Sequence, residues 1–144
     1  MSLPPEALSG VEFDVAIAAR TSVPVLISAA PEDAMRVASA IAGAYHGGAA
    51  MQVVAAADLG RLATAATADA RRRLFRTIVI RDIDSIDLGQ QKRLGVMLSR
   101  LRRKGAFRKW RLIATTSVPL YERVAAGTFD ARLFYNLNVI HIVV

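Results

Sequence analysis

The stretch RTIVIRDIDSIDLGQQKRLGVMLSRLRRKGAFRKWRLIATT, residues 76–116, decides the fold because it alternates a strand, a helix and a strand. Residues 77–80 are a β-branched run typical of a strand. From Leu94, apolar residues recur at i, i+3, i+4 and i+7, which predicts an amphipathic helix over residues 90–103. Residues 111–116 read as the next strand. Short apolar strands separated by helices indicate a parallel sheet covered by helices on both faces.

The same alternation continues on both sides of this stretch. A helix opens at Pro31, because proline suits the first helical position and the acidic residues that follow suit the first turn. We also expect helices over residues 11–20, over residues 58–74 and from Pro119 to Gly127. The predicted strands lie near residues 23–28, 51–56, 77–81, 110–116 and 138–143. The fold class is therefore α/β, a three-layer α/β/α domain with a mostly parallel, five-stranded sheet.

Composition predicts one soluble domain over residues 1–144. Hydrophobic residues make up 53% of the chain, enough for a sizeable core. There is no cysteine, which excludes disulfides and thiolate metal sites and is compatible with a reducing cytoplasm. No run approaches the 18 or so apolar residues of a membrane span, and no signal-peptide pattern is present. We expect a cytoplasmic protein without membrane association.

Three stretches carry a family resemblance: VPVLISAAPEDAMRVASAIAGAYH (23–46), RTIVIRDIDSIDLGQQKRLGVML (76–98) and RLIATTSVPLYERVAAGTFDARLFYNLNVIHI (111–142). They resemble, in the same order, segments of the AAA+ domain of sigma-54-dependent transcriptional activators. The resemblance implies an AAA+ fold with strand order 5-1-4-3-2 and ATP held where the first strand meets the next helix. It also implies remodelling of RNA polymerase that carries sigma-54.

The phosphate-binding loop departs from that family. Such a loop uses glycines to expose backbone N–H groups and a lysine to neutralise phosphates. Residues 28–35, SAAPEDAM, contain neither glycine nor lysine; the lysine position falls on Ala34 or Met35. Pro31 lacks a donor, and two acids at the helix N-terminus repel a polyanion. The vestigial nucleotide site comprises Ser28, Ala29, Ala30, Glu32, Asp33, Ala34, Met35, Arg81 and Asp82. We expect no catalytic residue and no cofactor, so the family's ATP and magnesium are expected to be lost.

The acidic motif after the third strand also departs from the family. The resemblance places Arg81 where a magnesium-linked aspartate is expected and Asp82 where the catalytic glutamate is expected. Asp82, Asp84 and Asp87 suit turn and cap roles in a strand-to-helix loop better than they suit a metal site. We therefore expect no metal site.

Further family positions are replaced. The sensor asparagine position holds Ser117, and the two arginines that act across subunits fall on Asp130 and Asn136; Arg132 is out of register for either. The segment between Gly48 and Thr77 is too short for the GAFTGA loop through which the family contacts sigma-54. The resemblance ends where a helical lid would begin, so neither a lid nor a helix-turn-helix is expected in this sequence.

Basic residues concentrate in one block. Residues 71–111 hold 14 of the 19 Lys and Arg but only three acids. Such a block is either a solvated face or a footprint for nucleic acid or an acidic partner. Within it, four cations crowd a predicted helix end, where the helix dipole explains two of them more readily than four. This candidate patch consists of Arg100, Arg102, Arg103 and Lys104.

Three functions remain open on the sequence. The first is a non-hydrolysing regulatory or interaction module that binds a protein partner in a transcription-regulatory complex. The second is a nucleic-acid-binding module that uses the basic block. The third is an ATPase with an unorthodox site in which Asp82 acts as the base. His46 and His141 are too isolated for catalysis, and Phe134 and Tyr135 are predicted to be core residues rather than stacking platforms.

Overall fold

The computed structural model describes residues 14–21, 23–44, 51–58, 60–61, 76–105 and 110–144. A helix over residues 14–19 comes first. The remaining elements are β1 (Val25–Ser28), α2 (Pro31–Ala44), β2 (Met51–Ala55), β3 (Arg76–Arg81), the 3₁₀ helix η1 (Ile83–Ser85), α4 (Leu88–Arg103), β4 (Trp110–Thr116), α5 (Leu120–Ala125), α6 (Ala131–Leu137) and β5 (Ile140–Val143). Most of the helix predicted over residues 58–74 lies outside the described residues.

The strands form one sheet in the order β2-β3-β4-β1-β5. Every strand pair in it is parallel. The predicted five-stranded parallel sheet and its order are therefore confirmed. In the register of the sheet, Val25 of β1 lies opposite Ile113 of β4 on one side and Ile140 of β5 on the other. The predicted strand boundaries agree with the observed ones within three residues.

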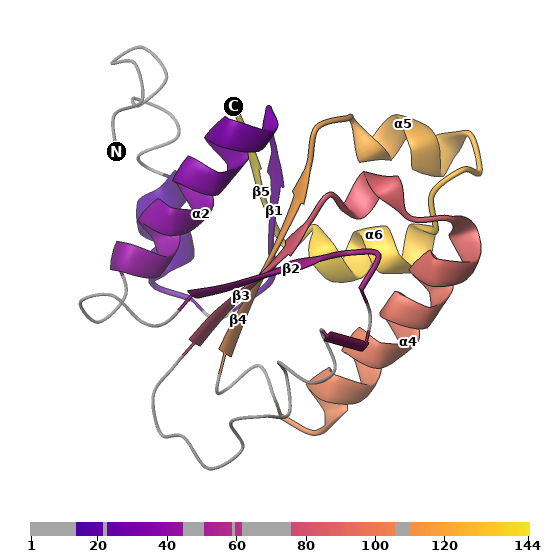
Figure 1. Ribbon diagram of the computed structural model, residues 1–144, viewed down its shortest axis with the longest axis horizontal. Helices are drawn as coiled ribbons and strands as arrows, with labels where there is room; N and C mark the ends of the chain where they lie inside the picture. Colours follow the sequence, from indigo (N-terminus) through magenta and orange to yellow (C-terminus); the bar gives the residue numbers. More distant parts are fainter. Residues whose placement is uncertain (1–13, 22, 45–50, 59, 62–75, 106–109) are drawn as a thin grey trace.

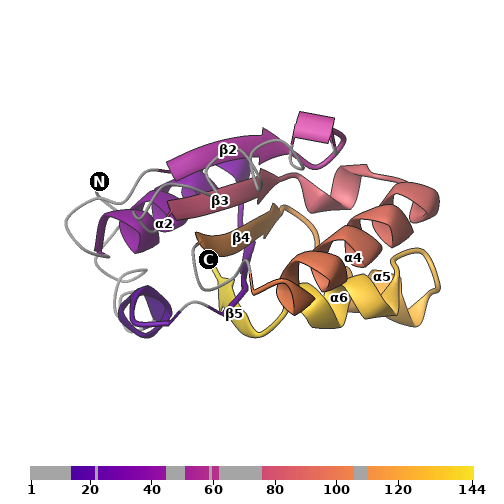
Figure 2. The same cartoon turned by 90° about the horizontal axis from the view of Figure 1, so that it is seen from below.

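Helices cover both faces of the sheet. The helix over residues 14–19 and α2 lie on one face, and α4, α5 and α6 lie on the other (Figures 1 and 2). Successive residues of a strand point to opposite faces. Accordingly, Ile78 and Ile80 of β3 belong to the core cluster beneath α4 and α6, while Val79 belongs to the cluster beneath α2. Apolar side chains at consecutive positions are what a sheet buried on both faces requires.

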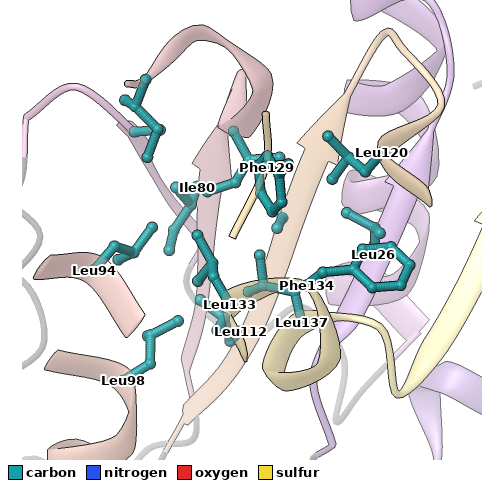
Figure 3. Close-up of a cluster of buried hydrophobic side chains, with 14 of the residues drawn as sticks. Leu26, Ile80, Leu94, Leu98, Leu112, Leu120, Phe129, Leu133, Phe134 and Leu137 are labelled. Atoms are coloured by element: carbon teal, nitrogen blue, oxygen red, sulfur yellow. The ribbon is translucent and has the colours of Figure 1, made fainter. Parts of the chain in front are cut away.

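The larger of the two clusters lies between the sheet and the last three helices. Figure 3 shows side chains from α4 and α6 meeting the strand residues Leu26, Ile80 and Leu112. Leu94 and Leu133 are fully buried there, so α4 and α6 pack against the sheet and against one another.

One helix was missing from the sequence prediction. The chain from Pro119 forms α5, which ends at Ala125, and a second helix, α6, follows before β5. Gly127 lies between them with φ +77°, a left-handed conformation that favours glycine and breaks the helix. Asp130 then starts α6, because its side chain accepts a hydrogen bond from the backbone N–H of Leu133 at 2.9 Å.

Helix α4 begins at Leu88, two residues before its predicted start, because Asp87 caps it. The Asp87 carboxylate accepts a hydrogen bond from Gln90 N at 2.8 Å, and Gln90 Oε1 accepts one from Asp87 N at 3.0 Å. This reciprocal capping box satisfies two backbone donors at the helix start.

Asp87→Ala is expected to lower the free energy of unfolding by about 1 kcal/mol, because it removes the cap acceptor at the start of α4. Urea denaturation monitored by far-UV circular dichroism measures the change. Asp87→Asn keeps an acceptor oxygen at the same place and should retain most of the stability. Equal losses in both variants would show that the cap hydrogen bond is not the cause.

Within the described residues, no helix combines the length and the apolar composition needed to cross a bilayer.

Candidate functional site

The predicted nucleotide site lies where β1 meets α2. Ser28 is the last residue of β1, and α2 begins at Pro31. The backbone N–H of Ala29 donates to the carbonyl of Thr116 at 3.0 Å, which fixes this connection against the end of β4. Arg81 ends β3, which is separated from β1 by β4. The structure thus places the β1–α2 connection and Arg81 at the same edge of the sheet, two strand positions or about 10 Å apart.

Both candidates for the lysine position face the interior. Ala34 is buried in the core beneath α2, and Met35 is partly buried against the same cluster. The Ala34 backbone N–H is already used, because it donates to the carbonyl of Ala30 at 2.8 Å in the first helical turn. Neither side chain offers a charge or a hydrogen bond to a phosphate.

The acids of the first turn of α2 remain near solvent. Glu32 is exposed and Asp33 is half-buried. Asp33 Oδ1 lies 3.5 Å from Arg36 Nη1, one turn further along the helix. This exposed i,i+3 pair adds little to stability, but it holds the nearest cation of α2 against a carboxylate.

The side chain of Arg81 forms an ion pair with that of the next residue, Asp82. Its Nε lies 3.4 Å from Asp82 Oδ2, and both side chains are about half exposed, at 51% and 47%. Asp82 has φ 60° and ψ 52°, the left-handed region that aspartate tolerates better than most residues. Its backbone N–H donates to Thr115 Oγ1 at 3.2 Å. The Asp82 carboxylate is the group that an unorthodox ATPase would use as its base. In the structure it lies against the Arg81 guanidinium.

Ser28 has a partner that the sequence analysis did not anticipate. Ser28 Oγ lies 2.7 Å from His141 Nε2 on the neighbouring strand β5. The prediction that His141 is a strand residue is confirmed, but the prediction that it is isolated is wrong: parallel pairing of β1 and β5 brings the two side chains together. Desolvation by burial lowers the pKa of His141 below its ordinary value of 6.5, which favours the neutral ring.

This pair does not amount to a nucleophilic site. In a serine–histidine–aspartate arrangement, a carboxylate orients the imidazole and stabilises its charged form. No carboxylate of the described residues contacts His141. His46 lies outside the described residues.

The three aspartates after β3 lie in different local settings, and of the three only Asp87 caps a helix with its side chain. Asp82 precedes η1, Asp87 caps α4, and the carbonyl of Asp84 accepts a hydrogen bond from Arg123 Nη1 at 3.1 Å. In the part of the chain that the structure describes, no three His, Cys, Asp or Glu side chains gather as metal ligands.

The positions matched to the family's sensor and arginines lie just after β4 and at the start and along the length of α6. Ser117 is exposed just beyond β4, and Asp130 caps α6. Arg132 is exposed and Asn136 is partly buried, both on α6.

Sequence reasoning missed Gln91, which is 3% exposed and links α4 to α6. Its Nε2 donates to the carbonyl of Ile86 at 3.0 Å, and its Oε1 accepts from the backbone N–H of Asp130 at 2.7 Å. A polar residue on the apolar side of the predicted helix was the available signal, because a buried amide needs partners.

The residues of the basic block, 71–111, differ in solvent exposure. The candidate patch, Arg100, Arg102, Arg103 and Lys104, is exposed at the end of α4 as predicted.

Arg111, which was counted with the surface block, is 0% exposed. Its guanidinium donates to the carbonyls of Thr21, Ala19 and Ile41 at 2.8, 3.1 and 3.3 Å. The interpretation of Arg111 as part of a surface footprint is wrong. The basic residues at 71–73, 108 and 109 lie outside the described residues.

Two adjacent aromatic residues of α6 also differ in burial. Phe134 is 4% exposed in the core, as predicted. Tyr135 is 66% exposed, so the prediction that it is a core residue is wrong. The two rings meet edge-on, with centroids 5.4 Å apart.

Comparison with known proteins places this geometry among P-loop NTPase-like folds. Residues 46–144 match the family described as the sigma-54 interaction domain. The structure is similar to that of NtrX from Brucella abortus in complex with ATP, with a TM-score of 0.73 and 16% identity over 100% of this chain and 38% of NtrX. It is also similar to the P-loop NTPase domain of the sigma-54 transport activator from E. coli, with a TM-score of 0.67 and 20% identity over 96% of both chains.

A third similar structure is the RuvB Holliday junction branch migration motor of Thermotoga maritima. Its TM-score is 0.65 at 14% identity, over 99% of this chain and 45% of RuvB. The chain thus spans less than half the length of NtrX and of RuvB. No curated protein matches the sequence at a significant level.

Proposed function

The chain belongs to the sigma-54 interaction domain family, and from this premise we propose that it acts as a regulatory or interaction module in transcriptional control. In this role it binds a protein partner of the transcription machinery. It neither binds nor hydrolyses ATP in the manner that the AAA+ fold implies, and it uses no metal.

The observation that carries this proposal is the chemistry of the β1–α2 connection. Phosphate affinity at such a site comes from backbone donors made accessible by glycine, from a lysine, and from magnesium held by an aspartate. Here alanines and Pro31 form the connection, and Ala34 and Met35 face the core. Glu32 and Asp33 add negative charge, and each carboxylate about 4 Å from a phosphate costs roughly 1 to 4 kcal/mol.

Arg81 is the residue that would most readily compensate. Its guanidinium lies against Asp82 and is half exposed, so solvent and a carboxylate already satisfy it. Arg36, the cation of α2, also lies against a carboxylate. Use of either one for a phosphate requires breaking an existing ion pair.

Titration of the protein with Mg-ATP in a calorimeter tests the proposal. We expect no binding tighter than about 10 μM, because each kilocalorie lost at the site is roughly a fivefold loss in affinity. A dissociation constant below that value, or nucleotide seated over residues 28–35 in a crystal, would contradict the proposal and favour an ATPase with an unorthodox site.

A variant without the two acidic charges distinguishes two causes of weak ATP binding: repulsion of the phosphates by carboxylates, and the absence of the glycines and lysine of a phosphate-binding loop. Glu32→Gln combined with Asp33→Asn removes both negative charges while keeping side-chain size. We expect this variant to remain a poor ATP binder, because glycine and lysine are still absent. Tight binding by the variant alone would show that repulsion is the sole obstacle.

The partner is tested by pull-down with the tagged protein at high salt, where exposed charge contacts are screened. Retention of a component of the transcription machinery under these conditions supports the proposed function. Loss of every protein partner at high salt would contradict it.

A further inference from the structure

The outward face of α4 carries a line of cations along almost its whole length. The face that packs on the core is defined by Leu94 and Leu98. At 3.6 residues per turn, the positions opposite them are 92, 93, 96, 100 and 103, which fall within about 100° of one another around the helix axis. These positions hold Lys92, Arg93, Val96, Arg100 and Arg103, all of them exposed. We call the four cations among them the α4 stripe.

The stripe only partly overlaps the patch predicted from sequence. Arg100 and Arg103 are common to both, and Lys104 continues the line at the cap of α4. Arg102 lies on the flank of the helix, beside the buried side. Lys92 and Arg93 belong to the basic block but not to the predicted patch. Lys92 lies 8 and 11 residues before Arg100 and Arg103, and Arg93 lies 7 and 10 residues before them, spacings that are typical of one helix face.

No acid neutralises these charges on the helix. Helix α4 contains no Asp or Glu. No ion pair joins a stripe residue to a carboxylate within the described residues. The helix dipole favours cations only in the last turn. It therefore accounts for Arg100 and Arg103, but not for Lys92 and Arg93 nearer the other end.

We propose that the α4 stripe binds the phosphate backbone of duplex DNA, without reading its sequence. From Lys92 to Arg103 the stripe spans about 17 Å along the helix axis, at 1.5 Å per residue. A duplex offers one negative charge about every 1.7 Å of its axis, so several phosphates lie within reach of such a line. Three of the four stripe cations, at positions 93, 100 and 103, are arginines, which bind phosphate oxygens in a bidentate manner.

Other occupants fit the stripe less well. A protein partner normally buries an aromatic or aliphatic centre, and the outward face of α4 offers only Val96 among the stripe cations. Single-stranded nucleic acid uses aromatic platforms for its bases, and none of the exposed α4 residues is aromatic. A membrane surface requires an apolar face beside the cations, whereas the apolar face of α4 is packed on the sheet. This inference goes beyond the proposed function and does not depend on the nucleotide site.

The test measures binding of the full chain to a fluorescein-labelled DNA duplex of about 20 base pairs by anisotropy, across a salt series. The variant Arg93→Gln, Arg100→Gln, Arg103→Gln should weaken binding about a hundredfold or more at about 0.1 M salt. Each lost phosphate contact lowers the magnitude of the salt slope by about 0.9, so the triple variant should lower it by about 2.7.

The matched control is Arg20→Gln, Arg36→Gln, Arg61→Gln, which removes the same charge from exposed positions elsewhere in the chain. We expect the control to weaken binding only a few-fold through net charge. Thermal unfolding within a few degrees of the parent protein shows that each variant is folded.

Each of three results with nucleic acid would overturn the proposal. They are no duplex binding by the parent protein at low salt, equal losses in the two triple variants, and a preference for single-stranded DNA of the same sequence. Binding to poly-glutamate that matches duplex binding in affinity and salt slope would also overturn it, because the stripe would then be a site for an acidic protein.

Discussion

Arg111→Met is expected to lower the free energy of unfolding by about 3 to 5 kcal/mol. The guanidinium of Arg111 lies on the α2 side of β4 and reaches the carbonyls that end two helices. Ala19 and Ile41 lie in the last turns of their helices and Thr21 follows the first of them, where carbonyls commonly need a donor from outside the helix. Each buried acceptor left without a donor costs about 1 to 3 kcal/mol, and three lose their partner together.

Chemical denaturation with guanidinium chloride measures this loss. Arg111→Lys is the informative companion variant, because it keeps a charge but lacks the planar fork of donors that reaches several carbonyls. We expect its stability to lie below that of the parent, since a buried ammonium with fewer hydrogen bonds is costly. A methionine variant as stable as the parent would show that the three hydrogen bonds contribute no net stability.

Phe134→Ala is expected to lower the free energy of unfolding by about 3 to 5 kcal/mol, because it removes a buried ring and leaves a cavity. The ring lies in the core cluster between α6 and the sheet, where Figure 3 shows it near Leu26 and Leu137. The same denaturation measurement applies.

Tyr135→Ala is the matched control for this prediction, since it removes an aromatic ring from the next position of the same helix. Tyr135 is 66% exposed, so its loss should change stability by no more than about 0.5 kcal/mol. A comparable loss in both variants would show that the ring-to-ring contact, rather than burial of Phe134, supports α6.

Much of the fold was readable from the sequence for a definite physical reason. The central strands of a parallel sheet buried on both faces are short, continuous apolar runs, as in the residues around Ile78 and Ile113. The amphipathic period of α4 was equally plain, from Leu94 to Leu101. The strand order followed from the resemblance and is confirmed by the observed pairing.

Only part of the candidate site could be predicted from the sequence. The missing lysine and glycines of residues 28–35 are facts of the sequence, and the structure adds that Ala34 is buried. The contact between Ser28 and His141 joins residues 113 positions apart. No local pattern contains such a contact, because it arises only when β1 and β5 pair.

By itself, the sequence determined the apolar strands, the amphipathic α4 and the chemistry of the β1–α2 connection, since each depends on residues close together in the chain. Only the tertiary structure decided the environment of individual polar and aromatic side chains. Arg111 and Arg103 belong to the same basic block, yet one is buried against carbonyls and the other faces solvent. A side chain's surroundings depend on which distant elements pack against it, and residue type and local spacing do not specify them.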